Sequence, residues 1–309
     1  MKQEQHEVAS TDNVTLCVKT WPARPSFDGD NEQRQKQALM AVIVHPYSRM
    51  GGSQFVTQGL AEYLCLRGFN VVTFDLRGAG KSTGHASFTG EPEVADVMAV
   101  CRWASEKYGQ RILLVGSSAG DPTAGSALPT LPAGGPIRGH RLPLALTPTL
   151  ISLPSSPSFF PSLRLLSNLL SPTAGAPIAG SALPHCPQVD LYVGVGYTFG
   201  FFSSLVFGSH YANVLTWPGP KLFIMGAKDG FTSTKTLETK AGKAVGVAKV
   251  SIVEDVGHFG LEGPAYDEEV AKRVVEFVAE QANAGAGGEG GGGGEEGAGG
   301  EEGIKESDS

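Results

Sequence analysis

Short, unbroken apolar runs are the feature of this sequence that most restricts its fold. They are three to five residues long and recur along most of the chain: Met40–Val44, Val71–Phe74, Ile112–Val115, Leu191–Val193, Leu222–Met225 and Val250–Val253. Continuous runs of this length are typical of strands buried on both faces of a parallel sheet. Residues 14–18 instead alternate between apolar and polar side chains, which predicts a half-exposed antiparallel strand at the start.

Segments with apolar residues at helical spacing lie between these runs. One stripe begins at Val56 and ends at Gly68, a second runs from Val94 to Gly109, and a third spans Val270–Val278. Strands that alternate with helices predict an α/β fold of three layers, with a mostly parallel central sheet, helices on both faces and right-handed crossovers.

One segment, residues 121–175, interrupts this alternation. It contains ten of the twenty prolines and four charged residues, so neither a helical nor a strand period survives in it. A near-repeat flanks it, because eight of ten positions are identical between Gly120–Pro129 and Gly175–Pro184. Two hypotheses follow. Either the first copy starts a short helix and the rest is an extruded loop, or the segment comes from a gene model that retained non-coding sequence, which we favour.

The C-terminal 26 residues, 284–309, form a second compositional outlier. They hold 12 glycines, six glutamates, one aspartate and one lysine, a local charge of −6 out of the total of −7. Such a segment buries too little apolar surface to fold, so we expect a disordered acidic tail. The rest of the chain is then nearly neutral, which excludes a basic nucleic-acid-binding surface. We therefore predict one domain over residues 1–283, interrupted by 121–175.

Cysteine spacing and the N-terminal sequence indicate which metal sites, compartment and membrane segments to expect. The four cysteines form no CxxC pair, so we expect reduced thiols, no metal site and no cofactor. The N-terminus lacks an apolar segment of the kind found in signal peptides, and no run of 18 uncharged apolar residues occurs. These features predict a cytoplasmic protein without a membrane span, and nothing in the sequence predicts an oligomeric state.

The strongest local signal for chemistry is Gly116-Ser-Ser-Ala-Gly120, which fits the pattern G-x-S-x-G directly after a predicted strand. This pattern places a serine on a sharp, strained strand-to-helix turn, which lifts the hydroxyl clear of the sheet. Ser118 is the predicted nucleophile.

A nucleophilic serine needs a base and an acid that orients the base. Asp229 and His258 each follow a predicted strand, so both are expected at the carboxyl edge of the sheet together with Ser118. His258 would accept the Ser118 proton and Asp229 would hold the imidazole. Asp255, three residues before His258, is the alternative acid.

An oxyanion hole needs two backbone N–H groups. Ala119, after the nucleophile, would supply one, and Tyr47, in the loop after the strand ending at Val44, would supply the other. His45 in that loop resembles a base, but beside a buried strand end we expect it to make structural hydrogen bonds.

We interpret two further motifs as structural elements without a catalytic or nucleotide-binding role. Gly80-Lys-Ser82 resembles the end of a phosphate-binding loop, but that motif requires glycine at position 75, which is Asp75. Gly196–Gly200 is a second elbow-like pentad around Thr198, which we interpret as a turn lining the site. Tyr197, Phe199 and residues 201–204 are then expected to line an acyl pocket.

The segments "VIVHPYSRMGG", "VVTFDLRGAGKSTG", "ILLVGSSAG", "LFIMGAKDGFTS" and "VEDVGHFGLEGP" together resemble the α/β-hydrolase superfamily. The similarity is to small capless serine hydrolases, of the serine aminopeptidase-like and dienelactone hydrolase-like kind, including uncharacterised plant and algal members. It covers about residues 38–120 and 176–281, and it implies the α/β-hydrolase fold with Ser118, Asp229 and His258 at the matching motif positions. The insert departs from the family pattern, in which the elbow continues directly into a helix.

These inferences predict a serine hydrolase that cleaves a carboxylic ester, thioester or amide of a small molecule or peptide through an acyl-enzyme intermediate. The alternative is a catalytically inactive binding or scaffold protein that keeps the fold, because fold alone does not establish chemistry.

Overall fold

The protein is described from a computed structural model, which covers residues 3–24, 39–46, 52–118, 175–199, 210–261 and 263–286. Within these residues eight strands form one sheet, in the spatial order β1-β2-β4-β3-β5-β6-β7-β8. The strands are β1 (Glu4–Ala9), β2 (Thr15–Trp21), β3 (Leu39–Val44), β4 (Asn70–Phe74), β5 (Arg111–Ser117), β6 (Val189–Val195), β7 (Lys221–Gly226) and β8 (Ala248–Val253).

Strands β3 to β8 are parallel, whereas β2 pairs antiparallel with both β1 and β4. All six predicted apolar runs lie inside these parallel strands. The alternating segment, apart from Val14, lies in β2, which is antiparallel as predicted but has five of its seven residues buried instead of being half exposed. The sequence did not predict β1, because Val8 is the one residue of this edge strand that is buried. An edge strand needs little apolar surface, so it leaves no clear hydrophobic pattern.

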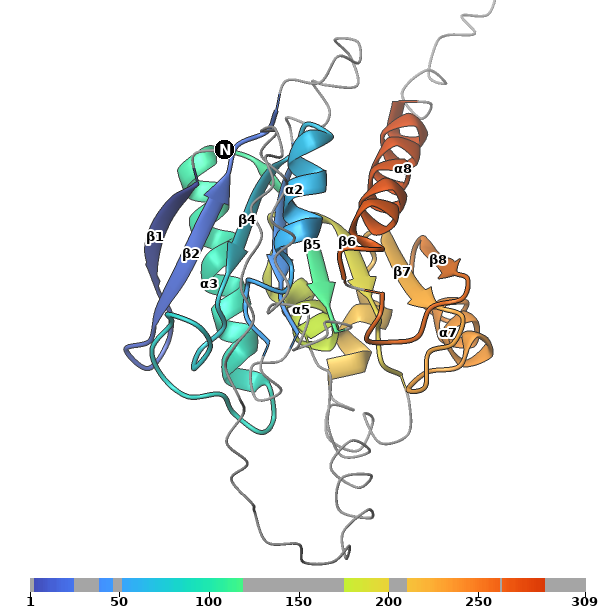
Figure 1. Cartoon of the computed structure of the whole chain (residues 1–309), viewed down its shortest axis with the longest axis horizontal. Helices are drawn as coiled ribbons and strands as arrows, with labels where there is room; N and C mark the ends of the chain where they lie inside the picture. The colour runs from blue at the N-terminus through green and yellow to red at the C-terminus, as the bar shows by residue number, and fades with distance from the viewer. Residues whose placement is uncertain are drawn as a thin grey trace, which may run out of the picture.

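Helices cover both faces of the sheet, as expected (Figure 1). The helices α2 (Gln58–Leu66) and α8 (Asp267–Ala286) pack against each other and share one apolar cluster with the sheet. The other cluster contains apolar residues of α3 (Glu91–Tyr108), α5 (Gly175–Ala182) and α7 (Thr234–Ala241), and of a helical segment at 210–216. The predicted three-layer α/β fold is confirmed.

The two compositional outliers lie largely outside the described residues, which include neither 121–174 nor 287–309. Described helices extend slightly into both segments. Gly175, expected to end the insert, begins α5, and α8 continues to Ala286, two residues beyond the expected start of the tail at Ala284.

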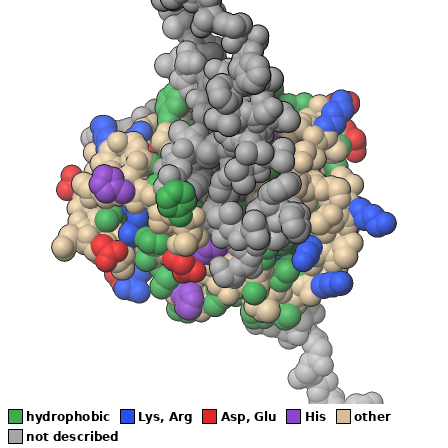
Figure 2. Space-filling view, turned by 90° about the horizontal axis from the view of Figure 1, so that it is seen from below, with side chains coloured by type: hydrophobic (Ala, Val, Ile, Leu, Met, Phe, Trp, Pro, Cys, Tyr) green, Lys and Arg blue, Asp and Glu red, His purple; other side chains and the backbone are tan. Residues whose placement is uncertain are grey.

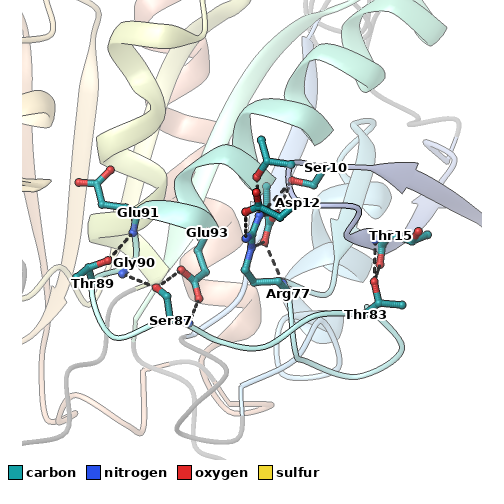
Figure 3. A network of polar contacts seen from close by, with 12 residues as sticks. Ser10, Asp12, Thr15, Arg77, Thr83, Ser87, Thr89, Gly90, Glu91 and Glu93 are labelled. Carbon is teal, nitrogen blue, oxygen red and sulfur yellow. Dashed lines mark hydrogen bonds and ion pairs between the residues drawn. The ribbon is translucent and has the colours of Figure 1, made fainter.

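The loop after β4 is tied to its surroundings by a buried ion pair. The Arg77 guanidinium donates from Nη2 to Asp96 Oδ1 at 2.8 Å and from Nε to Oδ2 at 3.0 Å, and both side chains are buried. Figure 3 shows that Arg77 also reaches Ser10 and Asp12 in the turn between β1 and β2. These contacts join the edge of the sheet to α3.

The same loop contains the segment that resembles a phosphate-binding motif. The Lys81 N–H donates to Asp75 Oδ2 at 3.1 Å, and the Ser82 hydroxyl donates to the Asp75 carbonyl at 2.6 Å. Gln54 donates to the same carboxylate from its N–H and its side-chain amide, both at 2.9 Å. The Lys81 and Gln54 donors are directed at the Asp75 carboxylate and the Ser82 hydroxyl at the Asp75 backbone carbonyl, which agrees with the structural interpretation.

Candidate active site

The loops after β7 and β8 lie against each other at the carboxyl edge of the sheet. The Lys228 N–H donates to the Val256 carbonyl at 2.9 Å, and the Ala227 N–H donates to the Val253 carbonyl at 2.8 Å. Gly226 makes this approach possible, because a Cβ there would lie 2.3 Å from the Val256 carbonyl oxygen. These contacts bring Asp229 and His258 together although they are 29 positions apart.

The Asp229 carboxylate holds the His258 ring from one side. Asp229 Oδ2 lies 2.7 Å from His258 Nδ1, and the two side chains are 1% and 2% exposed. The other carboxylate oxygen accepts the N–H groups of Phe231 at 2.7 Å and Thr232 at 3.0 Å. Because both oxygens have donors, the carboxylate is fixed in position and the imidazole is oriented with Nδ1 as its donor.

Asp255, the alternative acid, faces away from the histidine. Its side chain is 86% exposed and pairs with Lys228 Nζ at 3.0 Å. Its backbone has a φ of 60°, the left-handed conformation of a tight turn. Between the two carboxylates, Asp229 is therefore the one in contact with His258.

Ser118 lies at the same edge, immediately after β5. His258 Nε2 is 2.9 Å from the Ser118 carbonyl oxygen, and the Ser118 N–H donates to the Val195 carbonyl at 3.0 Å. The Ser118 hydroxyl accepts the Ala176 N–H at 2.9 Å, as an N-cap serine does in its own helix. The structure thus brings Ser118, His258 and Asp229 together, with the serine carbonyl rather than its hydroxyl toward the imidazole.

The conformation of Ser118 differs from the strained turn that the motif predicts. Among described residues other than glycine, φ is positive at Asp12, Asn13 and Asp255, so Ser118 is not in the left-handed region. Its side chain is also fully buried. After Ser118 the described residues resume at Gly175, the first residue of α5, 57 positions along the chain.

The second copy of the repeat packs behind Ser118. A Cβ at Gly116 would lie 2.7 Å from the Ala176 Cα, and a Cβ at Gly175 would lie 1.9 Å from the Ser117 carbonyl oxygen. The buried Tyr192 hydroxyl donates to the Ala176 carbonyl at 2.7 Å. In the family pattern a helix directly follows the elbow. Here α5 packs behind the elbow in that way, although Gly175, where it begins, is far from Ser118 in sequence.

The two copies differ at the positions that this packing buries. Ala176 and Ile178 are fully buried, and the first copy has Asp121 and Thr123 at the equivalent positions. An unpaired carboxylate in this place would carry a large desolvation cost. The second copy is therefore the better fit behind Ser118.

Both predicted oxyanion donors, Ala119 and Tyr47, lie outside the described residues. His45 is described and makes the expected structural contacts. It is fully buried, its Nε2 accepts the Leu76 N–H at 2.9 Å, and its Nδ1 contacts the Pro46 carbonyl. Burial lowers the pKa of His45, which favours the neutral ring that these contacts need.

The aromatic residues near Thr198 occupy a different place from the expected one. Tyr197 and Phe199 are buried in the core, stacked with ring centroids 4.4 Å apart, so they do not form an open acyl pocket. Residues 201–204 lie outside the described part of the chain. The turn still supports the site, because the Phe199 N–H donates to Thr232 Oγ1 at 2.8 Å, and Thr232 donates to Asp229.

Two aromatic side chains beside His258 received no role in the sequence analysis. The Phe231 and Phe259 ring centroids lie 4.5 and 5.2 Å from the His258 centroid. Their positions close to Asp229 and His258 in the chain were the available signal. Apolar residues in a loop have no period, so this signal did not distinguish them from ordinary loop residues.

A model of the alpha/beta hydrolase family matches residues 41–273. The chain belongs to this family. The match extends from β3 into α8 and so includes all three candidate residues. No curated protein sequence is significantly similar to the chain.

Solved structures of alpha/beta hydrolases have the same fold. A serine hydrolase homologue from Coxiella burnetii is 18% identical with a TM-score of 0.59, covering 89% of this chain and 97% of its own. A serine hydrolase without a lid from Xanthomonas campestris is 16% identical with a TM-score of 0.58, covering 91% and 95%. An esterase from Pyrococcus furiosus is 16% identical with a TM-score of 0.57, covering 90% and 91%. Similarity at this level concerns the fold.

No described helix is both long and apolar enough to cross a lipid bilayer. No group of three or more His, Cys, Asp or Glu side chains in the described residues is placed to hold a metal ion.

Proposed function

We propose that this alpha/beta hydrolase is a serine hydrolase that cleaves an ester, thioester or amide bond of a small molecule or peptide. One observation carries the proposal: the buried Asp229–His258 pair meets Ser118 at the carboxyl edge of the sheet, with 2.7 Å on one side of the ring and 2.9 Å on the other. Each residue comes from the end of a different parallel strand, where sheets of this class place their sites.

The proposed reaction begins with a rotation of Ser118 that exchanges its carbonyl for its hydroxyl at His258 Nε2. The hydroxyl proton moves to Nε2 as Oγ bonds to the substrate carbonyl carbon. The charge on the resulting oxyanion is accepted by the N–H groups of Ala119 and Tyr47. Nε2 then protonates the departing oxygen, nitrogen or sulfur, and the bond to it breaks. Water releases the acyl group by the same steps.

Asp229 is well placed for its role in this scheme. In the described conformation Nε2 faces the Ser118 carbonyl oxygen, which only accepts, so Nε2 is a donor there. Once Ser118 has rotated, the neutral ring with Nδ1 as donor to Asp229 has its lone pair on Nε2, where the serine proton arrives. The imidazolium formed by that transfer keeps the Asp229 hydrogen bond and gains an ionic partner. The two N–H bonds from Phe231 and Thr232 keep the carboxylate in place throughout.

Figure 2 views the carboxyl edge of the sheet from below, and the described residues on this face carry basic, acidic and apolar side chains interspersed.

A fluorophosphonate probe tests the proposal, because it bonds covalently to activated serines. We expect the full chain to be labelled, Ser118→Ala to lose labelling and Ser117→Ala to keep it. Ser117 is a matched control, since it is the buried neighbour whose Oγ has no hydrogen-bond partner in the described residues. Labelling that survives Ser118→Ala, or no labelling of folded protein, would refute the proposal.

The second candidate function is binding without catalysis. The buried Ser118 side chain and the bond from Ala176 N–H to its hydroxyl favour it, because a nucleophile must be reachable. A folded protein that is not labelled by the probe would support this candidate.

A further inference from the structure

Three rings form a compact group at the proposed site. Phe231 and Phe259 meet edge to face, with centroids 5.5 Å apart and an interplanar angle of 87°. Each also contacts the His258 ring, Phe231 at 4.5 Å and Phe259 at 5.2 Å. Edge-to-face contacts of this kind are favourable arrangements for aromatic side chains.

The position of this group is fixed by the proposed acid. Asp229 Oδ1 accepts the Phe231 N–H at 2.7 Å, and Asp229 Oδ2 contacts His258 Nδ1 at 2.7 Å. One carboxylate therefore sets the position of both the imidazole and the backbone that carries Phe231. Phe259 follows His258 directly in the chain, so its backbone is fixed with the histidine.

The outer ring of the group is available to a ligand. Phe259 is 42% exposed, whereas His258 and Asp229 are buried. Exposed aromatic area next to a buried polar pair can bind an apolar group while the polar pair acts on the adjacent bond.

The chemistry of the proposed reaction decides which part of the substrate lies there. The leaving group receives its proton from His258 Nε2, so the departing atom must come within hydrogen-bond distance of this nitrogen. The substituent on that atom then extends past the side chains around the imidazole. The acyl group lies on the other side of the bond, toward the oxyanion donors.

We propose that Phe231 and Phe259 form the leaving-group subsite and select an aromatic alcohol or amine, an inference that rests on the proposed serine hydrolase function. Such a substrate places its ring against Phe259, whose ring is held by its edge-to-face contact with Phe231. The two residues are specificity-determining and take no part in proton transfer.

Two isomeric esters test this assignment on the full chain. Benzyl acetate carries its ring on the alcohol, and methyl phenylacetate carries it on the acyl group. We expect kcat/KM for benzyl acetate to exceed that for methyl phenylacetate by about tenfold, the size of a good aromatic contact. We expect Phe259→Ala to lower kcat/KM for benzyl acetate about three- to tenfold through KM and to change methyl phenylacetate less than twofold.

Matched variants separate binding from damage to the site. Phe259→Trp keeps an aromatic surface and should keep the preference for benzyl acetate. Tyr108→Ala removes an exposed aromatic side chain at the opposite edge of the sheet and should change neither ester. Because phosphonylation of Ser118 needs no aromatic leaving group, Phe259→Ala should be labelled at the rate of the unaltered chain.

Two results would overturn the subsite while leaving the proposed function intact. One is labelling of Ser118 together with a preference for methyl phenylacetate. The other is a Phe259→Ala variant in which both esters slow by the same factor, which would mean that Phe259 only supports His258. Absence of labelling and of hydrolysis of both esters in folded protein refutes the serine hydrolase function, and the subsite with it.

Discussion

Removal of residues 121–175 tests how much free energy of folding is lost because Ser118 and α5 are far apart in the sequence. In the full chain the bond from Ala176 N–H to Ser118 Oγ joins residues 58 positions apart. The deletion removes 55 residues and joins Gly120 to Ala176, so the separation becomes 58 − 55 = 3, and Gly120 takes the place of Gly175. Every described contact of α5 from Ala176 onward stays in the shortened chain.

The expected gain in stability follows from the entropy of loop closure, because bringing two positions together costs more free energy the farther apart they are along the chain. This cost grows as about 1.5RT times the logarithm of the separation, so the difference is about 1.5 × 0.59 × ln(58/3), or about 2.6 kcal/mol in favour of the shortened chain. For a domain of this size the gain corresponds to a rise in Tm of about 5–10 °C.

Thermal unfolding followed by circular dichroism measures this difference, and urea unfolding measures it independently. Truncation after Ala286 is the control, because it shortens the chain without bringing two distant positions closer together. We expect the control to leave Tm unchanged. An equal or lower Tm for the shortened chain would refute the reasoning, since it would show that residues 121–175 contribute as much to the folded state as their closure costs.

Four further variants test individual side chains. Asp229→Asn should lower kcat about 10³-fold or more by removing the acceptor that orients His258, whereas Asp255→Asn should stay within twofold in the same ester assay. Asp96→Ala should cost about 3–5 kcal/mol in urea unfolding, because it leaves the Arg77 guanidinium buried without its main partner. Burial raises the pKa of Asp267 to about 6, so the folded state binds its proton more tightly and stability falls as pH rises from about 4 to 6. Asp267→Asn should therefore be about 3 kcal/mol more stable at pH 7 and equal to the unaltered chain below pH 4. A constant difference in stability across this pH range would contradict the assignment.

The mutual position of Asp229 and His258 could be predicted from sequence. Each follows a short apolar run, and parallel strands present their carboxyl ends at one edge, so order along the chain was enough to place them together. The sequence favoured Asp229 as the acid but left Asp255 open as the alternative. Both lie near a strand end, and only the left-handed turn at Asp255, which directs its side chain to solvent, separates them.

The positions of the aromatic residues near the site could not be predicted from the sequence. Tyr197 and Phe199 were expected at the surface of the site and are buried in the core, whereas Phe231 and Phe259 lie beside His258 without having been predicted there. Which loop side chains enter the core depends on the contacts between loops, which leave no periodic pattern in the sequence.

The sequence by itself determined the layers of this protein, because burial on a strand or helix face is a local property that appears as a period of apolar residues. The tertiary structure decided how Ser118 is oriented and which copy of the repeat lies behind it. Those outcomes depend on close approaches between distant backbones, at Gly116 and Gly175, and on the burial of Ala176, where the first copy has a carboxylate. The local sequence pattern identifies Ser118 as the candidate nucleophile, but only the packing around it determines where its hydroxyl points.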